Sequence, residues 1–322
     1  MNFLEHIITD GMAFGLPLFI MAVGGIYSEK SGITNLAVEG FQGFGAFCGA
    51  VLATLLGLTG NFSESTILYL ALVAAFLGGM LFATIHALLS IRFRADQVIS
   101  GVVVNILAVA LTTFLTSQIN GSLFGNASNK FMLGVSPRFS VPGLSNIPVL
   151  GAFFTDLYPF EIIILVVAVF AWYLMNKTRY GMRMQACGEN PQAVDAAGGN
   201  VVKIRFCSVL LSGGLSGIGG ICFAYSILSM FSPSIYLGYG YLAIAAMIFG
   251  NWDIVKTFWV CLFFGMARSG GYQLCLGMGL ASVYTDLFMI LPYMLTLLLL
   301  LFFSKRNHPP KAAGVVYEKN ER

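Results

Sequence analysis

The chain has 322 residues, of which 57% are hydrophobic and 10% are charged, and its formal net charge is +3. Soluble domains carry roughly 25% charged residues, so this composition excludes a globular domain that faces water on all sides. The small net charge gives no reason to expect nucleic-acid binding. Repeated long apolar segments predict instead an all-α, polytopic membrane helix bundle that forms a single domain over residues 1–322.

Nine apolar segments follow one another along the chain. We place them at residues 7–27, 33–58, 66–90, 98–119, 160–176, 206–230, 237–250, 254–267 and 283–303. No basic region precedes the first segment, so we expect a retained span and not a cleaved signal peptide. The seventh and eighth segments are short, which predicts tilted or broken helices around Gly250-Asn251-Trp252-Asp253 and about 8–10 transmembrane helices in all.

Glycines cluster within several of these segments. Gly45 and Gly49 are four residues apart, as are Gly213 and Gly217, so each pair lies on one face of a helix. Such faces of small residues let the backbones of membrane helices approach closely. The six cysteines form no C-x-x-C pair and lie mostly in apolar segments. We therefore expect buried thiols and no metal site.

Lysines and arginines are distributed unevenly between the two sides of the predicted bundle. If the turn that contains Arg92 and Arg94 is cytosolic, alternation of the spans leaves only Lys130, Arg138 and Arg268 outside, of the 17 basic residues. This positive-inside bias predicts a cytosolic C-terminus and, with nine spans, an external N-terminus.

Two loops and a tail connect or extend the predicted spans. Residues 120–159 are rich in Gly, Ser, Asn and Pro, and we expect an external loop that lies over the mouth of a cavity. Residues 176–205 are basic at both ends and form a predicted cytosolic loop, and residues 304–322 form a cytosolic tail.

The cytosolic loop contains the signals of a short helix. Asn190 is a good N-cap, Pro191 suits the first helical position, and Gly198 begins a left-handed stop. About two turns of helix are unstable alone in water, so another surface has to hold them. The apolar face at helical spacing consists of Ala193, Val194 and Ala197. From spacing alone, insertion into a groove on another protein and packing on the chain's own bundle are equally compatible with this face.

The loop TRYGMRMQACGENPQAVDAAGGNVVKIRF (178–206) resembles the cytosolic loop of the permease subunits of ABC importers for branched-chain amino acids, simple sugars and nucleosides. Further similar stretches follow the family's order: SEKSGITNLAVEGFQGFGAF (28–47), residues 94–101 with Asn105, SVLLSGGLSGIGG (208–220), YLAIAAMIFGNW (241–252) and ILPYMLTLLLL (290–300). The resemblance covers nearly the whole chain, and it is closer to the nucleoside permeases than to those for ribose or branched-chain amino acids.

This resemblance implies a non-catalytic permease subunit in a bacterial cytoplasmic membrane. The chain contains no P-loop, no metal cluster and no G-x-S-x-G element, in agreement with that role. ATP and Mg would bind to a partner ATPase that grips the short cytosolic helix, called the coupling helix in this family. The implied coupling residues are Glu189, Asn190, Pro191, Ala193, Val194, Ala197 and Gly198. A second permease subunit, commonly a different homologous chain, and an extracellular substrate-binding lipoprotein would complete the importer.

Few ionisable residues fall inside the predicted spans. A carboxylate near the bilayer centre costs about 2.5–3.5 kcal/mol on insertion scales, so Glu39 should face the bundle interior or water. Asn35, Glu39 and Gln42 have i, i+4 and i+7 spacing, which predicts one polar helix face that lines the substrate path together with Asn105. In an almost equally supported alternative, Glu39 satisfies a helix end or a backbone break beside Gly40.

Two tyrosines and two further ionisable residues also fall in or near the predicted spans. Tyr239 and Tyr241 flank a glycine at a span entrance and are candidates for contact with a planar base. His86 and Asp286 are expected to lie near span ends and to be structural. The alternatives to a nucleoside permease are a permease for ribose or another simple sugar, and a secondary transporter that works alone, which would need ion-coupling carboxylates in the membrane.

Overall fold

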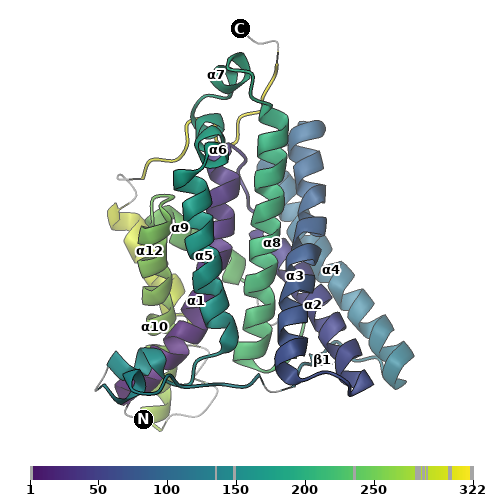
Figure 1. Cartoon of the computed structure of the whole chain (residues 1–322), viewed down its shortest axis with the longest axis vertical. Coiled ribbons are helices and arrows are strands. Elements are labelled where there is room, and N and C mark those ends of the chain that lie inside the picture. Colours follow the sequence, from purple (N-terminus) through teal and green to yellow (C-terminus); the bar gives the residue numbers. More distant parts are fainter. Residues whose placement is uncertain are drawn as a thin grey trace.

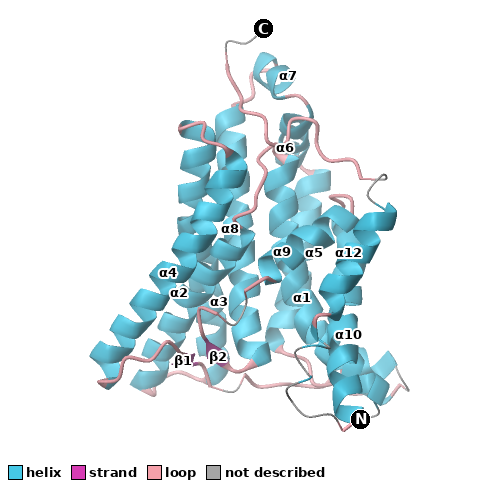
Figure 2. Ribbon diagram, turned by 180° about the vertical axis from the view of Figure 1, so that it is seen from behind, coloured by secondary structure: helices cyan, strands magenta, loops and turns pink. Residues whose placement is uncertain are grey.

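Helices form nearly all the regular structure of the chain (Figure 2). The computed structural model describes residues 3–134, 136–147, 150–234, 237–279, 284, 287, 289–303 and 307–319. Its long helices are α1 (Phe3–Lys30), α2 (Val38–Thr59), α3 (Glu64–Ala87, continued by the π-helical turn Leu88–Arg92), α4 (Gln97–Phe124), α5 (Pro159–Lys177), α8 (Val201–Ile227) and α10 (Ile254–Gly277). Its shorter ones are α6 (Arg179–Glu189), α7 (Pro191–Ala196), α9 (Tyr239–Phe249) and α12 (Leu291–Phe303).

Regular structure other than α-helix is confined to short pieces of the described chain. The strands β1 (Phe131–Met132) and β2 (Met230–Phe231) pair antiparallel, with Phe131 opposite Phe231. Two short 3-10 helices, Leu144–Asn146 and Leu150–Phe154, lie in the loop before α5. The predicted all-α membrane bundle is therefore confirmed.

Within the described residues, six helices are long and apolar enough to cross a bilayer: α1, α2, α3 with its π-helical turn, α4, α5 and α8. The predicted segment 33–58 differs from the structure at its start, because residues 33–37 are not helical and α2 begins at Val38. The predicted junction at Gly250-Asn251-Trp252-Asp253 does separate two helices, but only α9 is short, since α10 has 24 residues.

α9 is a half-helix. It has 11 residues and is therefore about 16 Å long at 1.5 Å per residue, roughly half the thickness of a bilayer's hydrocarbon core. A helix of this length cannot reach both faces of the membrane, so one of its ends lies inside the bundle, where water does not satisfy the free backbone groups.

The two chain ends lie at opposite ends of the bundle (Figure 1). The N-terminus lies at the end where β1 is found, and the C-terminus lies beside α6 and α7 at the other. Asp286, Lys305, Arg306 and Arg322, which entered the predictions above, lie outside the described residues.

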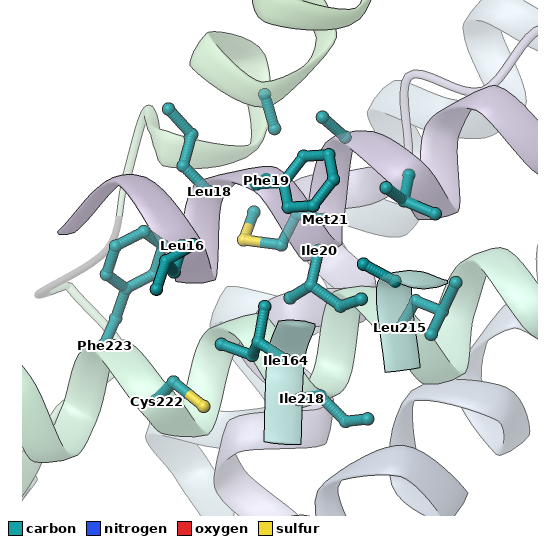
Figure 3. Packing of buried hydrophobic residues seen from close by; sticks show 14 of the residues in the cluster. Leu16, Leu18, Phe19, Ile20, Met21, Ile164, Leu215, Ile218, Cys222 and Phe223 are labelled. Atoms are coloured by element: carbon teal, nitrogen blue, oxygen red, sulfur yellow. The ribbon is translucent and has the colours of Figure 1, made fainter. Parts of the chain in front are cut away.

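α1 and α8 form the centre of the bundle, and they are the most buried of the candidate spans. Figure 3 shows Leu16, Ile20 and Met21 of α1 packed with Ile164 of α5 and with α8, whose labelled residues are Leu215, Ile218, Cys222 and Phe223. All six cysteines are free, and most are buried, as expected.

Glycine backbones bring α2, α3 and α8 into direct contact. A Cβ atom on Gly217 would lie 2.2 Å from the carbonyl oxygen of Ala75, and one on Gly79 would lie 2.1 Å from that of Gly213. A Cβ atom on Gly45 would lie 2.4 Å from the Cα atom of Gly217. The close approach predicted from the spacing of Gly45, Gly213 and Gly217 is confirmed.

Candidate functional site

The chain interrupts its helices between α1 and α2, at residues 31–37, which we call the α1–α2 break. Asn35 lies in this break, where its Oδ1 atom accepts a hydrogen bond from the Ala37 N–H (3.0 Å) and its Nδ2 atom donates to Ser212 Oγ on α8 (2.9 Å). The prediction that Asn35, Glu39 and Gln42 share one helix face is therefore wrong for Asn35. The physical reason is that its side chain holds a turn that delays the helix until Val38.

Asn105 of α4 satisfies the beginning of α2. Its Oδ1 atom accepts a hydrogen bond from the Gly40 N–H (2.8 Å), and its Nδ2 atom donates to the Leu36 carbonyl (2.8 Å) and to the Tyr241 hydroxyl (3.0 Å). The residue at the N-cap position, Ala37, supplies no side-chain hydrogen bond. Asn105 thus does from a neighbouring helix what an N-cap residue would do locally.

Glu39 satisfies the beginning of α9. Its carboxylate accepts a hydrogen bond from the Gly238 N–H at 2.7 Å and further ones from the N–H groups of Gly240 and Tyr241. Glu39 is only 7% exposed, and a buried anion is stabilised at the positive end of a helix. The alternative in which Glu39 satisfies a helix end is therefore what the structure contains, although the end belongs to α9 and not to the break beside Gly40.

The two helix beginnings form one polar network. A Cβ atom on Gly240 would lie 2.5 Å from the Glu39 Cα atom, so α9 begins in direct contact with the first turn of α2. Tyr241 receives Asn105 at its hydroxyl while the residue stays 44% exposed. Gln42 is fully buried one turn further along α2. We call Glu39, Asn105, Tyr241 and the N–H groups that they bind the midplane network.

A second buried carboxylate, Glu29, holds the other end of α9 and was missed by the sequence analysis. It accepts a hydrogen bond from the Trp252 indole N–H at 2.6 Å, in the turn between α9 and α10, and another from the Asn35 backbone. Its position just before the basic end of an apolar segment gave it the pattern of a solvated helix end. Each end of the half-helix is thus tied by a glutamate to the region around the α1–α2 break.

His86 is structural, as the sequence analysis expects. Its Nδ1 atom lies 2.8 Å from Ser100 Oγ and its Nε2 atom 3.3 Å from the Thr34 carbonyl, so the ring joins α3 to α4 and to the α1–α2 break. Among the described residues, no group of three or more His, Cys, Asp or Glu side chains is placed to hold a metal ion.

Aromatic rings and a cation surround a cavity beside the start of α9. The Arg268 guanidinium carbon lies 4.5 Å from the ring centre of Phe14 and 6.0 Å from that of Tyr239, and the two rings meet edge to face. The cavity, which we call the aromatic cavity, measures about 160 Å³ and is lined by Phe14, Tyr239, Leu242, Arg268, Met289, Ile290, Pro292 and Tyr293. A neighbouring cavity of about 390 Å³ shares Phe14, Arg268 and Met289 with it.

Of the two tyrosines predicted to contact substrate, Tyr239 lines this cavity and Tyr241 lies in the midplane network instead. From the sequence we expect Arg268 only as an external charge. The sequence does mark Arg268 as unusual, because it is the single cation in the apolar stretch FFGMARSGG (263–271).

The predicted cytosolic-loop helix is present as α7. Asn190 Oδ1 accepts a hydrogen bond from the Ala193 N–H (3.0 Å), Pro191 is the first helical residue, and Gly198 has a φ of +78°. α7 projects beyond the ends of the long helices, next to the C-terminus (Figure 1). The N-cap, first-turn and stop signals that were identified in the sequence are therefore confirmed.

The predicted apolar face of this helix is only partly correct. Val194 is 7% exposed and belongs to the buried cluster of the chain, so it faces the bundle and not solvent. The physical reason is the glycine turn, which folds the chain back so that Gly199 lies directly against Val194. Asn190 and Gly198 are also exposed, at the two ends of α7. The docking face is our name for five exposed residues between and beside them: Glu189, Gln192, Ala193, Ala196 and Ala197.

The sequence of this chain is similar to permease proteins along almost its whole length. The model of the family described as "Branched-chain amino acid transport system / permease component" matches residues 7–300. The guanosine ABC transporter permease protein NupQ of Bacillus subtilis is 37% identical over 99% of this chain and 98% of its own length. The nucleoside ABC transporter permease protein NupC of Lactococcus lactis is 36% identical over 99% of both chains.

A second permease protein of Bacillus subtilis is also related. The guanosine ABC transporter permease protein NupP is 25% identical over 84% of this chain and 75% of its own length. No solved structure matches the chain significantly.

We predict that Asn105→Ala destabilises the protein by about 1–3 kcal/mol, because it leaves the Gly40 N–H and the Leu36 carbonyl unsatisfied inside the bundle. The measurement is the thermal unfolding of the purified protein in detergent. Asn176→Ala is the matched control, since Asn176 is exposed and donates only to the Trp172 carbonyl of its own helix. Equal melting temperatures for the two variants would contradict the role given to Asn105.

Proposed function

The chain belongs to the family of permease components of the branched-chain amino acid transport system type, and on that premise we propose that it is the permease subunit of an ATP-driven importer of nucleosides. It is a multi-pass membrane protein and forms half of the translocation path. The observation that carries the choice of substrate is the similarity to two permeases named for guanosine and for nucleosides, which extends over almost the whole chain.

The docking face is the contact for a separate ATPase subunit, which binds ATP and Mg and performs the hydrolysis. Support comes from the small exposed side chains of Ala193, Ala196 and Ala197, which leave the backbone of α7 open to close contact. In this proposal the buried Pro191 and Val194 support the contact from behind, whereas Asn190 and Gly198, which form the ends of α7, are exposed beside the docking face.

The end of the bundle that carries α7 faces the cytosol of a bacterial cell. Lys30, the Arg92 turn and the basic residues of α6 gather at that end, whereas Lys130 and Arg138 belong to the loop before α5 at the opposite end, in agreement with the positive-inside rule. The C-terminus is then cytosolic, and the loop before α5 faces an extracellular binding lipoprotein.

The second permease subunit is a different homologous chain. Support comes from NupP and NupQ, since one organism has two guanosine permease proteins, both of which are related to this chain. The two subunits would enclose the path, and movement of the two ATPases would switch its access from one side of the membrane to the other.

The aromatic cavity receives the nucleoside base. A base is planar and carries carbonyl and ring-nitrogen acceptors, so it can stack on Tyr239 while Arg268 donates hydrogen bonds to it. The midplane network adjoins Tyr239, because Glu39 accepts hydrogen bonds from its two chain neighbours, Gly238 and Gly240. These bonds fix the start of α9. Asn35 and Gln42 are fully buried, so they support the path from behind in this conformation.

A secondary transporter that works alone is the rival function. Interrupted helices also occur in such transporters, but they need a carboxylate that is able to bind the coupling ion. Glu39 is already held by three N–H groups of α9, which disfavours that use. Uptake by the lone chain in liposomes without nucleotide would favour this rival.

We predict that Ala193→Asp abolishes stoichiometric co-purification of the ATPase, because it buries a charge without a partner in the contact. The measurement is the ratio of ATPase to permease after affinity purification of the co-expressed importer. Ala127→Asp is the matched control, since Ala127 is exposed in the loop before α5. Unchanged co-purification with Ala193→Asp would overturn the docking assignment.

For the substrate, we predict that unlabelled nucleosides compete with labelled guanosine for ATP-dependent uptake by the complete importer, whereas ribose and leucine do not. The physical reason is that a cavity with stacking rings and a cation recognises the base, which sugars and amino acids lack. The measurement is the rate of uptake at a fixed excess of each competitor. Competition by ribose that equals the competition by guanosine would instead favour the simple-sugar alternative.

We also predict that Arg268→Gln lowers guanosine uptake at subsaturating concentration by about tenfold, as the loss of one hydrogen bond from a charged donor implies. The measurement is the initial rate of uptake, normalised to the amount of assembled importer. Lys130→Gln removes another cation, in an exposed position, and should leave the rate unchanged. If both variants transport guanosine at the wild-type rate, Arg268 does not contact the base.

A further inference from the structure

The C-terminal tail, residues 307–319, crosses the end of the bundle that carries α7 (yellow in Figure 1). Its backbone hydrogen bonds join His308 to Asn251, Ala312 to Gly188 and Gly314 to Gly32. Its side chains add an ion pair between Glu318 and Arg94, and Tyr317 lines a cavity together with Asp195 of α7. The tail therefore contacts the α9–α10 turn, the end of α6, the α1–α2 break and the turn before α4.

Arg205 of α8 lies where the tail passes over the α1–α2 break. Its Nε atom donates a hydrogen bond to the Ser31 carbonyl (3.1 Å), and its Nη1 atom donates to the Val315 carbonyl (3.0 Å). Gly32 has a φ of +93°, and a Cβ atom there would lie 2.6 Å from Nη2. The guanidinium thus occupies a space that the backbone of the break leaves open for it.

Removing the Arg205 guanidinium from water has a large free-energy cost. Arg205 is only 2% exposed, and the one ion pair in the described part of the chain joins Arg94 to Glu318 elsewhere. A buried charge costs several kcal/mol unless hydrogen bonds offset that cost. Here the offset comes from the carbonyls at the negative end of α1 and from the tail. Its Nη2 atom reaches no acceptor among the described residues, so the site is not fully satisfied in this conformation.

The surroundings of Arg205 connect the docking face to the midplane network. Gly188, in the last turn of α6, packs against the Lys30 carbonyl at the end of α1. The tail links Gly188 to Arg205, because the Ala312 N–H donates to the Gly188 carbonyl and the Val315 carbonyl accepts from Arg205. Arg205 also donates a hydrogen bond to the Ser31 carbonyl. The α1–α2 break, which starts at Ser31, contains Asn35 and leads into Glu39 in the first turn of α2. A displacement of α6, which leads directly into α7, therefore has a continuous path of backbone and side-chain contacts to the start of α9.

We propose that Arg205 is a positioning residue that couples movement of the docking face to the α1–α2 break and so to the midplane network. This inference rests on the proposed function as an ATP-driven permease. It assigns to the tail and to Arg205 a role in transmission, beyond a contribution to stability. Removal of the guanidinium should leave the importer able to assemble and to hydrolyse ATP, but less able to convert hydrolysis into uptake.

The test uses the complete importer, with both permease subunits, the ATPase and the binding protein, in liposomes. ATP hydrolysis and guanosine uptake are measured in the same vesicles for the wild type, Arg205→Gln, Arg205→Lys and Lys203→Gln. Lys203 is an exposed cation two residues away on α8, so Lys203→Gln is the matched control. We expect Arg205→Gln to lower uptake per ATP hydrolysed by about tenfold, Arg205→Lys to restore part of it, and the control to match the wild type.

A second variant, lacking residues 315–322, removes the Val315 acceptor and leaves α8 intact, so the inference stays testable if Arg205→Gln does not fold. It should also lower uptake per ATP. An unchanged ratio in either folded variant, or a parallel loss of hydrolysis and uptake, would overturn the transmission role. Failure of the wild-type importer to take up nucleosides with ATP would instead count against the proposed function.

Discussion

The structure depends on how two helix beginnings are satisfied inside the bundle. A bilayer offers no water to N–H groups, so a helix can start at mid-depth only where protein atoms accept its first hydrogen bonds. Asn105 meets this requirement for α2, and Glu39 meets it for α9. Each acceptor belongs to a different helix from the one that it caps. The positions of α2, α4 and α9 are consequently fixed by one set of hydrogen bonds.

The same arrangement places several buried polar residues along one line, from Glu29 through the α1–α2 break to Glu39. Glu29 holds the turn after α9, the α1–α2 break follows directly, and Glu39 holds the start of α9. The half-helix is thus gripped at both ends by neighbouring parts of one segment, residues 29–39. At one end of this line Gly32 contacts the tail and Lys30 contacts α6. At the other end Glu39 accepts hydrogen bonds from Gly238 and Gly240, the chain neighbours of Tyr239. These eleven residues therefore contact both ends of α9 as well as the tail.

Local signals predicted much of this protein, and distant contacts decided the rest. The spans follow from apolar length, and the ends of α7 follow from Asn190, Pro191 and Gly198, which act within one turn of the chain. The helical spacing of Asn35 and Glu39 misled, because Ser212, 177 residues away, holds Asn35 outside the helix. Val194 looked like part of an exposed face because its burial depends on the fold-back at Gly199. Arg268 could be recognised as unusual, but its aromatic neighbours come from α1 and α9.

The glycine contacts among α2, α3 and α8 also determine which parts of the molecule can shift. Where Gly217 faces Ala75 and Gly79 faces Gly213, there is room only for hydrogen atoms between two backbones. Sliding by one residue would drive a methyl group or a larger side chain into that space. The three helices therefore form a stiff block, which α9 contacts at its first turn, where Gly240 lies against Glu39.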